Sequence, residues 1–597
     1  MSAKPSLFAE LKRRNVYRAA VLYAAGAWLA VQVATQVFPF FHIAEWIVRW
    51  IVIAAIIGFP FWLAFAWYYE FTPEGIRRES EIDPADSIAA HTGKKLDRWI
   101  IAILALAVVL LLTNTFVWRK GAGLSADADG ERIAEHSIAV LPFVNMSDEK
   151  SNEYFSDGIS EELLNLLAKI PQLQVTARTS SFSFKGKEVA IPEIARTLHV
   201  AHVLEGSVRK AGNSVRITAQ LIKAGTDTHL WSQTYDRKLD DIFKVQDEIA
   251  AAVVEQLKIK LLGAAPTAKP VDGQAYALFL QARAVERQGS AESFEQAIAL
   301  YQQAVALDAS DAAAWTGLAE VYCLQEYQYQ RPAAEATRLA REALEHALAS
   351  DPGYAPAHAQ LGWIAIFLDR DLAAAARHLE HALSLDPGNT DVLGIAAILA
   401  RRLGRFEQAV AIGRHLLSHD PVSPTGWDDL GYALLYAGHR DEAMAAFRKV
   451  LQLSPNFAGE HWNIAALLAQ EGDAGTAMAD AQQETDPQFR LYALTAAHFA
   501  IGEKARSDAL FAEAIERYGA TSAYSIALLA ALRGETDLSF EWLDKALQHG
   551  EPDLGAVPAY PTFIGLHGDP RWLPYLRRIG YAPEQLEKIE FKVTLPQ

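Results

Sequence analysis

Three long apolar runs lie near the start of the chain, and their lengths predict helices that cross a lipid bilayer. The runs cover residues 19–41, 47–69 and 99–118. About 20 helical residues rising 1.5 Å each span the roughly 30 Å hydrocarbon core. The third run has no charged residue between Trp99 and Trp118, and tryptophan suits both membrane interfaces. The sequence therefore predicts a transmembrane region over residues 19–120, after a basic leader over residues 1–18.

The positions of lysine and arginine predict how this region is oriented. The leader and residues 70–98 are rich in both, whereas residues 42–46 contain neither. Because positively charged loops stay in the cytoplasm, we expect the N-terminus and the 70–98 loop inside and residues after about 120 outside. In a Gram-negative bacterium, the anchor would lie in the inner membrane and the body in the periplasm. Alternatively, the first run, which contains two glutamines and Pro39, does not cross, which reverses the side of the body.

After a small-residue linker over residues 121–135, the pattern alternates between short apolar strands and amphipathic helices. Strands are expected at 137–143, 173–178, 202–209, 214–223 and 228–235, and helices at 156–169, 191–198 and 242–262. In the strand over 214–223, apolar and polar residues alternate, as in a sheet with one buried face. The order β-α-β-α-β-β-β-α predicts one α/β domain over residues 136–263.

From residue 272 the chain becomes alanine-rich and periodic. Four prolines recur 35, 34 and 34 residues apart: Pro352, Pro387, Pro421 and Pro455. A period of 34 is that of tetratricopeptide repeats (TPRs), which are pairs of antiparallel helices. The best unit contains Trp427, Leu430, Gly431, Leu434, Gly438, Ala443, Phe447 and Pro455. We expect about eight repeats over 272–549, forming an α-solenoid, and a C-terminal cap over 550–597.

A solenoid of this kind has a concave groove lined by the first helix of each pair, and such grooves hold extended or helical peptides. The residues expected to face the groove are Asp428, Tyr432 and Tyr436 in the best unit, and Trp462 and Asn463 in the next. The alternative is that each aromatic side chain belongs to the core between helices.

The middle domain also resembles a known family. The residues that carry the resemblance are SIAVLPFVNMSDEKSNEYFSDGISEELLNLLAKIPQLQVTARTSSFSFKG from Ser137, then AHVLEGSVRKAGNSVRITAQLI and HLWSQTYDR. They are similar to the TolB-like amino-terminal domain family and to the related FlgO-like domain. The resemblance implies an anticodon-binding-like α/β fold and an interaction role in envelope proteins, without catalytic residues. The leader resembles that of membrane tetratricopeptide proteins with the same middle domain. Some of those relatives carry a winged-helix or cyclase domain in front, which this sequence lacks, so neither activity is implied.

Charge and cysteine content narrow the classes of partner. The formal net charge is −17, and residues 1–120 hold 13 Lys/Arg against 9 Asp/Glu, so the remaining residues carry the acidic excess. An acidic body is a poor ligand for nucleic acid and favours a basic or amphipathic protein partner. Cys323 is the one cysteine, which excludes an internal disulfide and any metal site built from cysteines.

The candidate catalytic and metal-binding motifs in the sequence each lack a residue that the motif requires. The run from Gly158 to Glu162 has glutamate where a nucleophile elbow needs its second glycine, so Ser160 is interpreted as a helix residue. His415 and His419 lack the intervening glutamate of H-E-x-x-H, and pairs of this kind arise by chance among 17 histidines. We therefore expect no catalytic residue, no cofactor and no metal.

These observations favour a membrane-anchored scaffold that binds envelope proteins or peptides, with no nucleic-acid partner and with a homo-oligomer left open. One alternative is a signalling component that passes an envelope stimulus to a partner or regulator. Enzymatic activity is a third hypothesis, which the failed motifs disfavour.

Overall fold

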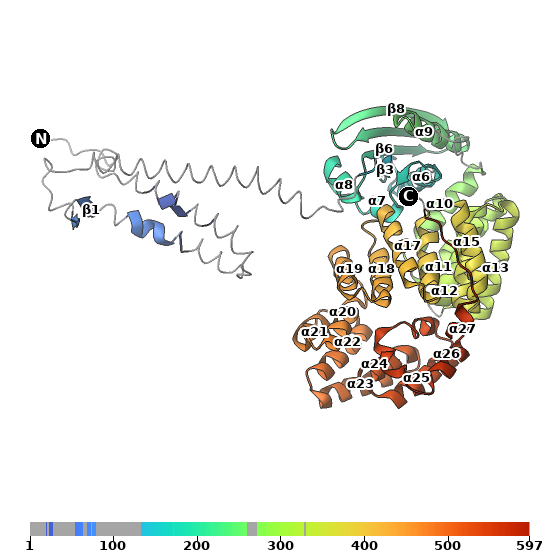
Figure 1. Ribbon diagram of the computed structural model, residues 1–597. Coiled ribbons are helices and arrows are strands. Elements are labelled where there is room, and N and C mark those ends of the chain that lie inside the picture. The colour runs from blue at the N-terminus through green and yellow to red at the C-terminus, as the bar shows by residue number, and fades with distance from the viewer. Residues whose placement is uncertain are drawn as a thin grey trace, which may run out of the picture. The chain divides into compact units, whose positions relative to one another are not determined.

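The computed structural model in Figure 1 describes residues 133–595, except 171, 260–270 and 328–329, together with short stretches between residues 20 and 78. The chain divides into two units, residues 1–132 and 133–597. In the first, β1 (Tyr69–Thr72) and β2 (Gly75–Arg78) form an antiparallel hairpin, which the sequence did not predict.

Most of the expected membrane-spanning segments at 19–41, 47–69 and 99–118 lie outside the described residues. None of the helices that the structure does describe combines the length and the apolar character needed to cross a bilayer. The Tyr23 hydroxyl donates a hydrogen bond to the carbonyl oxygen of Ala55 at 3.0 Å. Tyr23 also lies beside the rings of Phe59 and Trp62, at centroid distances of 5.7 and 5.9 Å.

The second unit begins with the predicted α/β domain, which the structure confirms. Its strands are β3 (Ser137–Val140), β4 (Val144–Asn145), β5 (Gln174–Val175), β6 (His202–Ala211), β7 (Ser214–Lys223) and β8 (Thr228–Lys238). They form a sheet in the order β5-β3-β6-β7-β8, with β4 also paired to β6. The pairs β3–β5 and β3–β6 are parallel, whereas β6–β7 and β7–β8 are antiparallel. The domain's helices are α6 (Glu153–Ala168), α7 (Arg178–Phe182), α8 (Ile191–Leu198) and α9 (Ile242–Gln256).

Alternating side chains of β3 and of Leu141, the residue after it, supply the cores on the two faces of this sheet. Ile138 and Val140 are buried in the larger core with residues of α6 and α9, whereas Ala139 and Leu141 join the core under α8. In β7, Val215, Ile217, Ala219 and Leu221 are all buried on one face, as their alternation predicts.

Several predicted elements of this domain differ in their bounds from the structure, and two of the differences concern β5 and α6. The strand expected at 173–178 is only β5, because residues from Arg178 turn into α7. Asp420, far along the chain, accepts hydrogen bonds from the amide and the hydroxyl of Ser180 in that helix. The helix expected from Ser156 begins three residues earlier, at Glu153.

The described residues from Gly273 to His549 form eight helical hairpins. The first four hairpins are α10 (Gly273–Glu286) with α11 (Ala291–Leu307), α12 (Ala312–Tyr327) with α13 (Ala333–Ser350), α14 (Ala355–Ile364) with α15 (Leu372–Leu385), and α16 (Thr390–Arg402) with α17 (Phe406–His419). The second four are α18 (Pro424–Ala437) with α19 (Arg440–Leu453), α20 (Glu460–Glu471) with α21 (Ala474–Ala481), α22 (Pro487–Ala500) with α23 (Lys504–Tyr518), and α24 (Ala523–Leu532) with α25 (Thr536–His549). This helical array confirms the predicted solenoid.

Small residues bring the two helices of a hairpin together. A Cβ on Gly431 of α18 would lie 2.4 Å from the ring of Phe447 in α19. Ala443 at the same crossing is fully buried. First helices of successive hairpins also contact each other, as α12 does α14 and α14 does α16. The first helices therefore line the inner, concave side of the array.

The C-terminal region returns to the array after the last hairpin. It contains the short 3-10 helices η7 (Pro552–Ala556) and η8 (Pro561–Leu566), followed by α26 (Trp572–Ile579) and α27 (Pro583–Leu586). The tail then runs back beside α15 and α17 (Figure 1). There the Arg405 guanidinium donates to the carbonyl oxygen of Phe591 at 2.7 Å. The predicted cap is therefore also a strap across the third and fourth hairpins.

Candidate protein-binding groove

The groove is the concave side of the array, and one recurring position on the first helices defines its lining. This position directly follows the small residue of each repeat motif, and it is occupied by Glu320 after Ala319, Trp363 after Gly362 and Tyr432 after Gly431. Because the position recurs with the repeat, these side chains project from the first helices of their hairpins on the same side.

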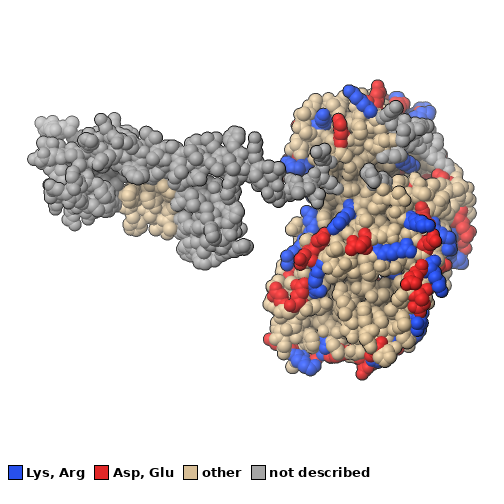
Figure 2. Space-filling view, viewed as in Figure 1, with Lys and Arg blue, Asp and Glu red and all other residues tan. Residues whose placement is uncertain are grey.

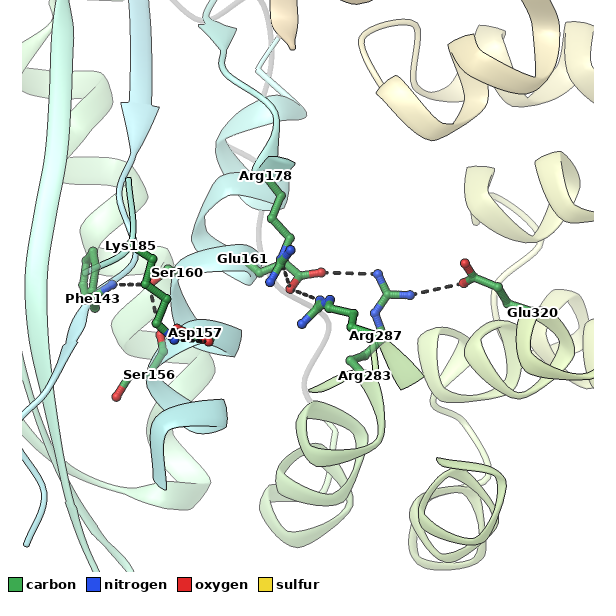
Figure 3. Close-up of polar contacts among 10 residues, drawn as sticks. All are labelled: Phe143, Ser156, Asp157, Ser160, Glu161, Arg178, Lys185, Arg283, Arg287 and Glu320. Atoms are coloured by element: carbon green, nitrogen blue, oxygen red, sulfur yellow. Dashed lines mark hydrogen bonds and ion pairs between the residues drawn. The ribbon is translucent and has the colours of Figure 1, made fainter. Parts of the chain in front are cut away.

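At its first end, the groove holds the α/β domain. Figure 3 shows the Glu161 carboxylate of α6 facing three arginines, Arg178 of α7 and Arg283 and Arg287 of α10. Arg178 Nε lies 2.8 Å from Glu161 Oε2, and Arg283 Nη2 lies 3.3 Å from Oε1. Arg283 also reaches Glu320 Oε2 of α12 at 3.2 Å. Burial alone would raise the pKa of Glu161, but Arg283, Arg287 and Arg178 hold it at about 2.

Two further contacts fix the α/β domain to the array. Gly158 of α6 allows close packing, because a Cβ there would lie 2.4 Å from a methyl group of Leu280. At the turn between α17 and α18, the Ala177 amide donates to the carbonyl oxygen of His419 at 2.7 Å. The turn also supplies Asp420, which binds α7 as described above. The turn at Asp420–Pro421 therefore ends a repeat and also contacts the α/β domain.

At the other end, the groove is filled by residues 551–566, here called the cap segment. The ring of Tyr560 lies 6.3 Å from that of Tyr432 and 6.1 Å from that of Tyr436. Gln470 of α20 donates to the Thr562 hydroxyl at 2.7 Å. The chain's own cap segment therefore covers the two tyrosines that were expected to face the groove.

The other three residues expected in the groove lie beside this aromatic cluster. Trp462 and Asn463 are each only 6% exposed, so they form part of the core between helices rather than an open ligand surface. Asn463 is held by the Tyr432 hydroxyl, which donates to Asn463 Oδ1 at 2.8 Å. Asp428 is half-buried and hydrogen-bonds the carboxyl group of Glu460.

Asp428 and Glu460 form a buried acid pair. Glu460 is 0% exposed, and burial followed by repulsion from Asp428 raises its pKa. Burial and repulsion from Asp429 raise the pKa of Asp428 in the same way. Two carboxyl groups sharing a buried site hold a proton between them more readily than either does alone.

Between these two filled ends, hairpins two to four keep part of their concave side open. We call this the middle stretch, and it consists of Glu320, Leu324, Trp363, Asp391 and Ile398. All five residues are half-buried or exposed, and the side chain of Glu320 is 42% exposed. The Trp363 ring packs on Phe367 at a centroid distance of 4.8 Å.

The middle stretch is acidic as well as apolar. Burial, then repulsion from Glu286, raises the pKa of Glu320 to about 7. Asp391, an exposed residue of α16, adds a second carboxylate. Elsewhere, acidic and basic side chains are interspersed on the face shown in Figure 2.

Among the described residues, no group of three or more His, Cys, Asp or Glu side chains is placed to hold a metal ion. His419 Nδ1 lies 3.2 Å from the carbonyl oxygen of Val175, at the contact with the α/β domain. The His415 and His419 rings are 5.1 Å apart. His419 thus takes part in a contact between domains.

Sequence reasoning missed the Glu161 cluster, the cap segment and Glu460. The signal for the first was available, because Arg283 and Arg287 are four residues apart on one helical face. Their partner lies more than 120 residues earlier, and only the folded chain identifies it. The cap segment has no periodic pattern that would place it in the groove.

Comparison with solved structures finds matches of low sequence identity. One is Pseudomonas aeruginosa PilF, with 21% sequence identity, covering 35% of this chain and 92% of that one, at a TM-score of 0.30. Another is TTC0263, a TPR protein of Thermus thermophilus, with 20% identity, covering 32% of this chain and 98% of that one, at a TM-score of 0.28. YrrB, described as a TPR protein with an unusual peptide-binding site, has 20% identity, covering 30% of this chain and 87% of that one, at a TM-score of 0.22.

A curated relative and two family models also match. The relative is named "Putative adenylate cyclase 3", from Rhizobium meliloti (strain 1021), and is 37% identical over 256 residues. The match covers 41% of this chain and 43% of the relative, so it spans less than half of the relative's length. Models of the tetratricopeptide repeat match residues 367–428 and 424–457. The C-terminal region of this chain therefore contains tetratricopeptide repeats.

Proposed function

We propose that this chain is a non-catalytic scaffold that recruits protein or peptide partners to a membrane. TPR arrays bind polypeptides along their concave side, and here the middle stretch remains accessible between two filled ends. Residues 19–118 provide the anchor in the bacterial inner membrane, and the body from about residue 120 lies in the periplasm.

The observation that carries this proposal is the half-buried side chain of Trp363, with Glu320 and Asp391 on the neighbouring helices. An aromatic anchor bordered by polar groups is typical of the residues that dominate protein interfaces. The α/β domain bounds the stretch on one side through its contacts with α10 and with the turn after α17.

The α/β domain fits a role in interaction rather than catalysis. Its sequence resembles the TolB-like amino-terminal domain, and its mixed sheet with helices on both faces is compatible with the fold that this resemblance implies. We propose that it holds the array in a fixed curvature and adds a second binding surface.

Crosslinking in cells, followed by purification of the full chain and identification of its partners, tests the scaffold. We expect Trp363→Ala to lose partners that the unchanged chain retains. The matched control is Leu385→Ala, because Leu385 is a 40% exposed apolar residue of the same hairpin, in its second helix. If both variants retain the same partners, the middle stretch is not the binding surface.

Reporter fusions test the proposed location. Alkaline phosphatase is active only outside the cytoplasm, so fusions at residue 130 and at the C-terminus should both be active. Inactivity at both positions would contradict a periplasmic body and would favour the alternative in which the first apolar run does not cross.

A second candidate function is membrane signalling, which the match to "Putative adenylate cyclase 3" favours. A signalling component would exchange partners when conditions change. Repeating the crosslinking under osmotic and acid stress separates the two, because a scaffold keeps one set of partners. Cyclic AMP production by the purified full chain would contradict the non-catalytic proposal directly.

A further inference from the structure

We propose that the middle stretch binds a basic segment of a partner protein, whose lysine or arginine side chains pack along Trp363 and end among carboxylates. This inference rests on the proposed function, because it specifies the partner of the same groove.

Carboxylates face the stretch from two of its helices. Glu320 comes from α12 and Asp391 from α16. The negative charge of Asp391 contributes to raising the pKa of Glu320, so these groups lie near enough to repel one another. A cation placed between them relieves that repulsion.

The arginines of α7 and α10 beside the stretch are already paired with carboxylates. Arg178 and Arg287 are paired with Glu161, and Arg283 bridges Glu161 and Glu320. Within the part of the chain that the structure describes, Asp391 has no ion-pair partner within 4.0 Å. The carboxylate of Asp391 is therefore left for a cationic ligand.

Apolar surface beside the carboxylates determines the shape of the ligand. Trp363, Leu324 and Ile398 are all half-buried and lie on the adjacent helices α14, α12 and α16. Lysine and arginine carry an apolar stem of three or four carbons behind the charged group, and such stems pack along apolar surface. An acidic segment would bring like charges together at the same place, which costs free energy.

The experiment measures binding of the purified full chain to an array of synthetic 15-residue peptides of graded net charge. The strongest binder is then remade with every lysine acetylated, which removes the charge and keeps the stem. Affinities are compared for the double variant Glu320→Gln/Asp391→Asn and the control Glu342→Gln/Glu345→Gln. The control carboxylates are exposed on α13, the second helix of hairpin two.

We expect the strongest binders to be basic, and both acetylation and the double variant to weaken binding by about tenfold or more. The control should stay within about twofold. Both double variants replace carboxylates by amides of similar shape, and circular dichroism checks that each remains folded.

Three results would overturn the inference. Basic binders that respond equally to both double variants would show general attraction to an acidic protein. If peptides without positive charge bind strongly and Trp363→Ala weakens that binding, the partner is not basic, but the proposal that the chain is a scaffold still holds. An array on which no peptide binds would overturn both proposals.

Discussion

The segments that fill the two ends of the groove are held there by different kinds of interaction. At the first end, Glu161 meets three arginines, so the α/β domain is fixed by charge-assisted hydrogen bonds at the rim of its core. At the other end, Tyr560 of the cap segment packs on Tyr432 and Tyr436 above a buried acid pair. The first contact depends on ionised groups, and the second on apolar burial and on a carboxyl group that keeps its proton.

This difference shows how one helical array binds two different neighbours, the α/β domain and the cap segment. Ionic contacts are geometrically selective and fix the α/β domain in one orientation. Aromatic packing supplies more stabilisation for each residue, because a ring buries a large apolar area. The stretch between the ends has features of both, with carboxylates beside a tryptophan, and it remains open.

The largest expected effect comes from removing the aromatic contact. Tyr560→Ala deletes a ring that is 7% exposed, and we expect a loss of about 3 kcal/mol in the free energy of unfolding. Denaturant titration of the full chain, followed by circular dichroism, measures it. Ile564→Ala is the control in the same segment, because Ile564 is 62% exposed and its loss should cost less than about 0.5 kcal/mol. Equal effects from the two variants would show that the cap segment is not packed in the groove.

The ionic contact should give the next largest effect. Glu161→Gln leaves three guanidinium groups without their shared charge, but the arginine side chains are 28%, 28% and 31% exposed, so water compensates in part. We expect a loss of about 2 kcal/mol, below the range for fully buried pairs. Glu188→Gln, an exposed site in the same domain, should change little. A loss greater than that of Tyr560→Ala would reverse the order proposed for the two ends.

The sequence predicted the array better than the α/β domain, and the reason is the range of the contacts. Hairpins pack against their chain neighbours, so the spacing from Pro352 to Pro455 carries most of the information. In the sheet, β3 pairs with β5 and β6. The helix α7 that follows β5 is bound by Asp420, about 240 residues away from Ser180. Local pattern alone contains no record of such a contact.

The candidate site shows the same limit. The repeat pattern correctly placed Tyr432 and Tyr436 on the first helix of their hairpin, because helical periodicity is local. It did not reveal that Tyr560 covers both rings, since the cap segment follows no repeat. Trp462 was expected to face the groove from its place in the repeat, with a core position as the alternative, and it packs on Tyr492 at a centroid distance of 6.1 Å.

Changing the pH should separate the two ends. The pKa of Glu161 is lowered to about 2, so its stabilisation is complete above the unfolded value of about 4.3 and is lost as the pH falls through 2. The pKa of Glu460 is raised, so the folded state keeps a proton that the unfolded state has lost, and stability falls as the pH rises above about 4.3.

Unfolding titrations at several pH values test this contrast. With Glu161→Gln, the loss of stability below pH 4.3 should be smaller by about 1 kcal/mol or more. With Glu460→Gln, the loss of stability between pH 4.3 and neutral pH should be smaller by about 1 kcal/mol or more. If Glu460→Gln leaves the dependence of stability on pH above 4.3 unchanged, Asp428 and Glu460 do not share a proton under the cap segment.

The smallest effect is expected from an ion pair at the surface of the α/β domain, which marks the lower limit of the ionic contribution. Lys185 Nζ lies 2.6 Å from Asp157 and 2.8 Å from Glu153, and Figure 3 shows it beside the helix that carries Glu161. Because its side chain is 35% exposed, Lys185→Ala should cost about 0.5 kcal/mol, and added salt should remove the difference. Lys187→Ala, at an exposed lysine nearby, is the control for losing one positive charge. If Lys185→Ala lowered the free energy of unfolding as much as Glu161→Gln, the strength of the Glu161 contact would not come from the three arginines that share its carboxylate.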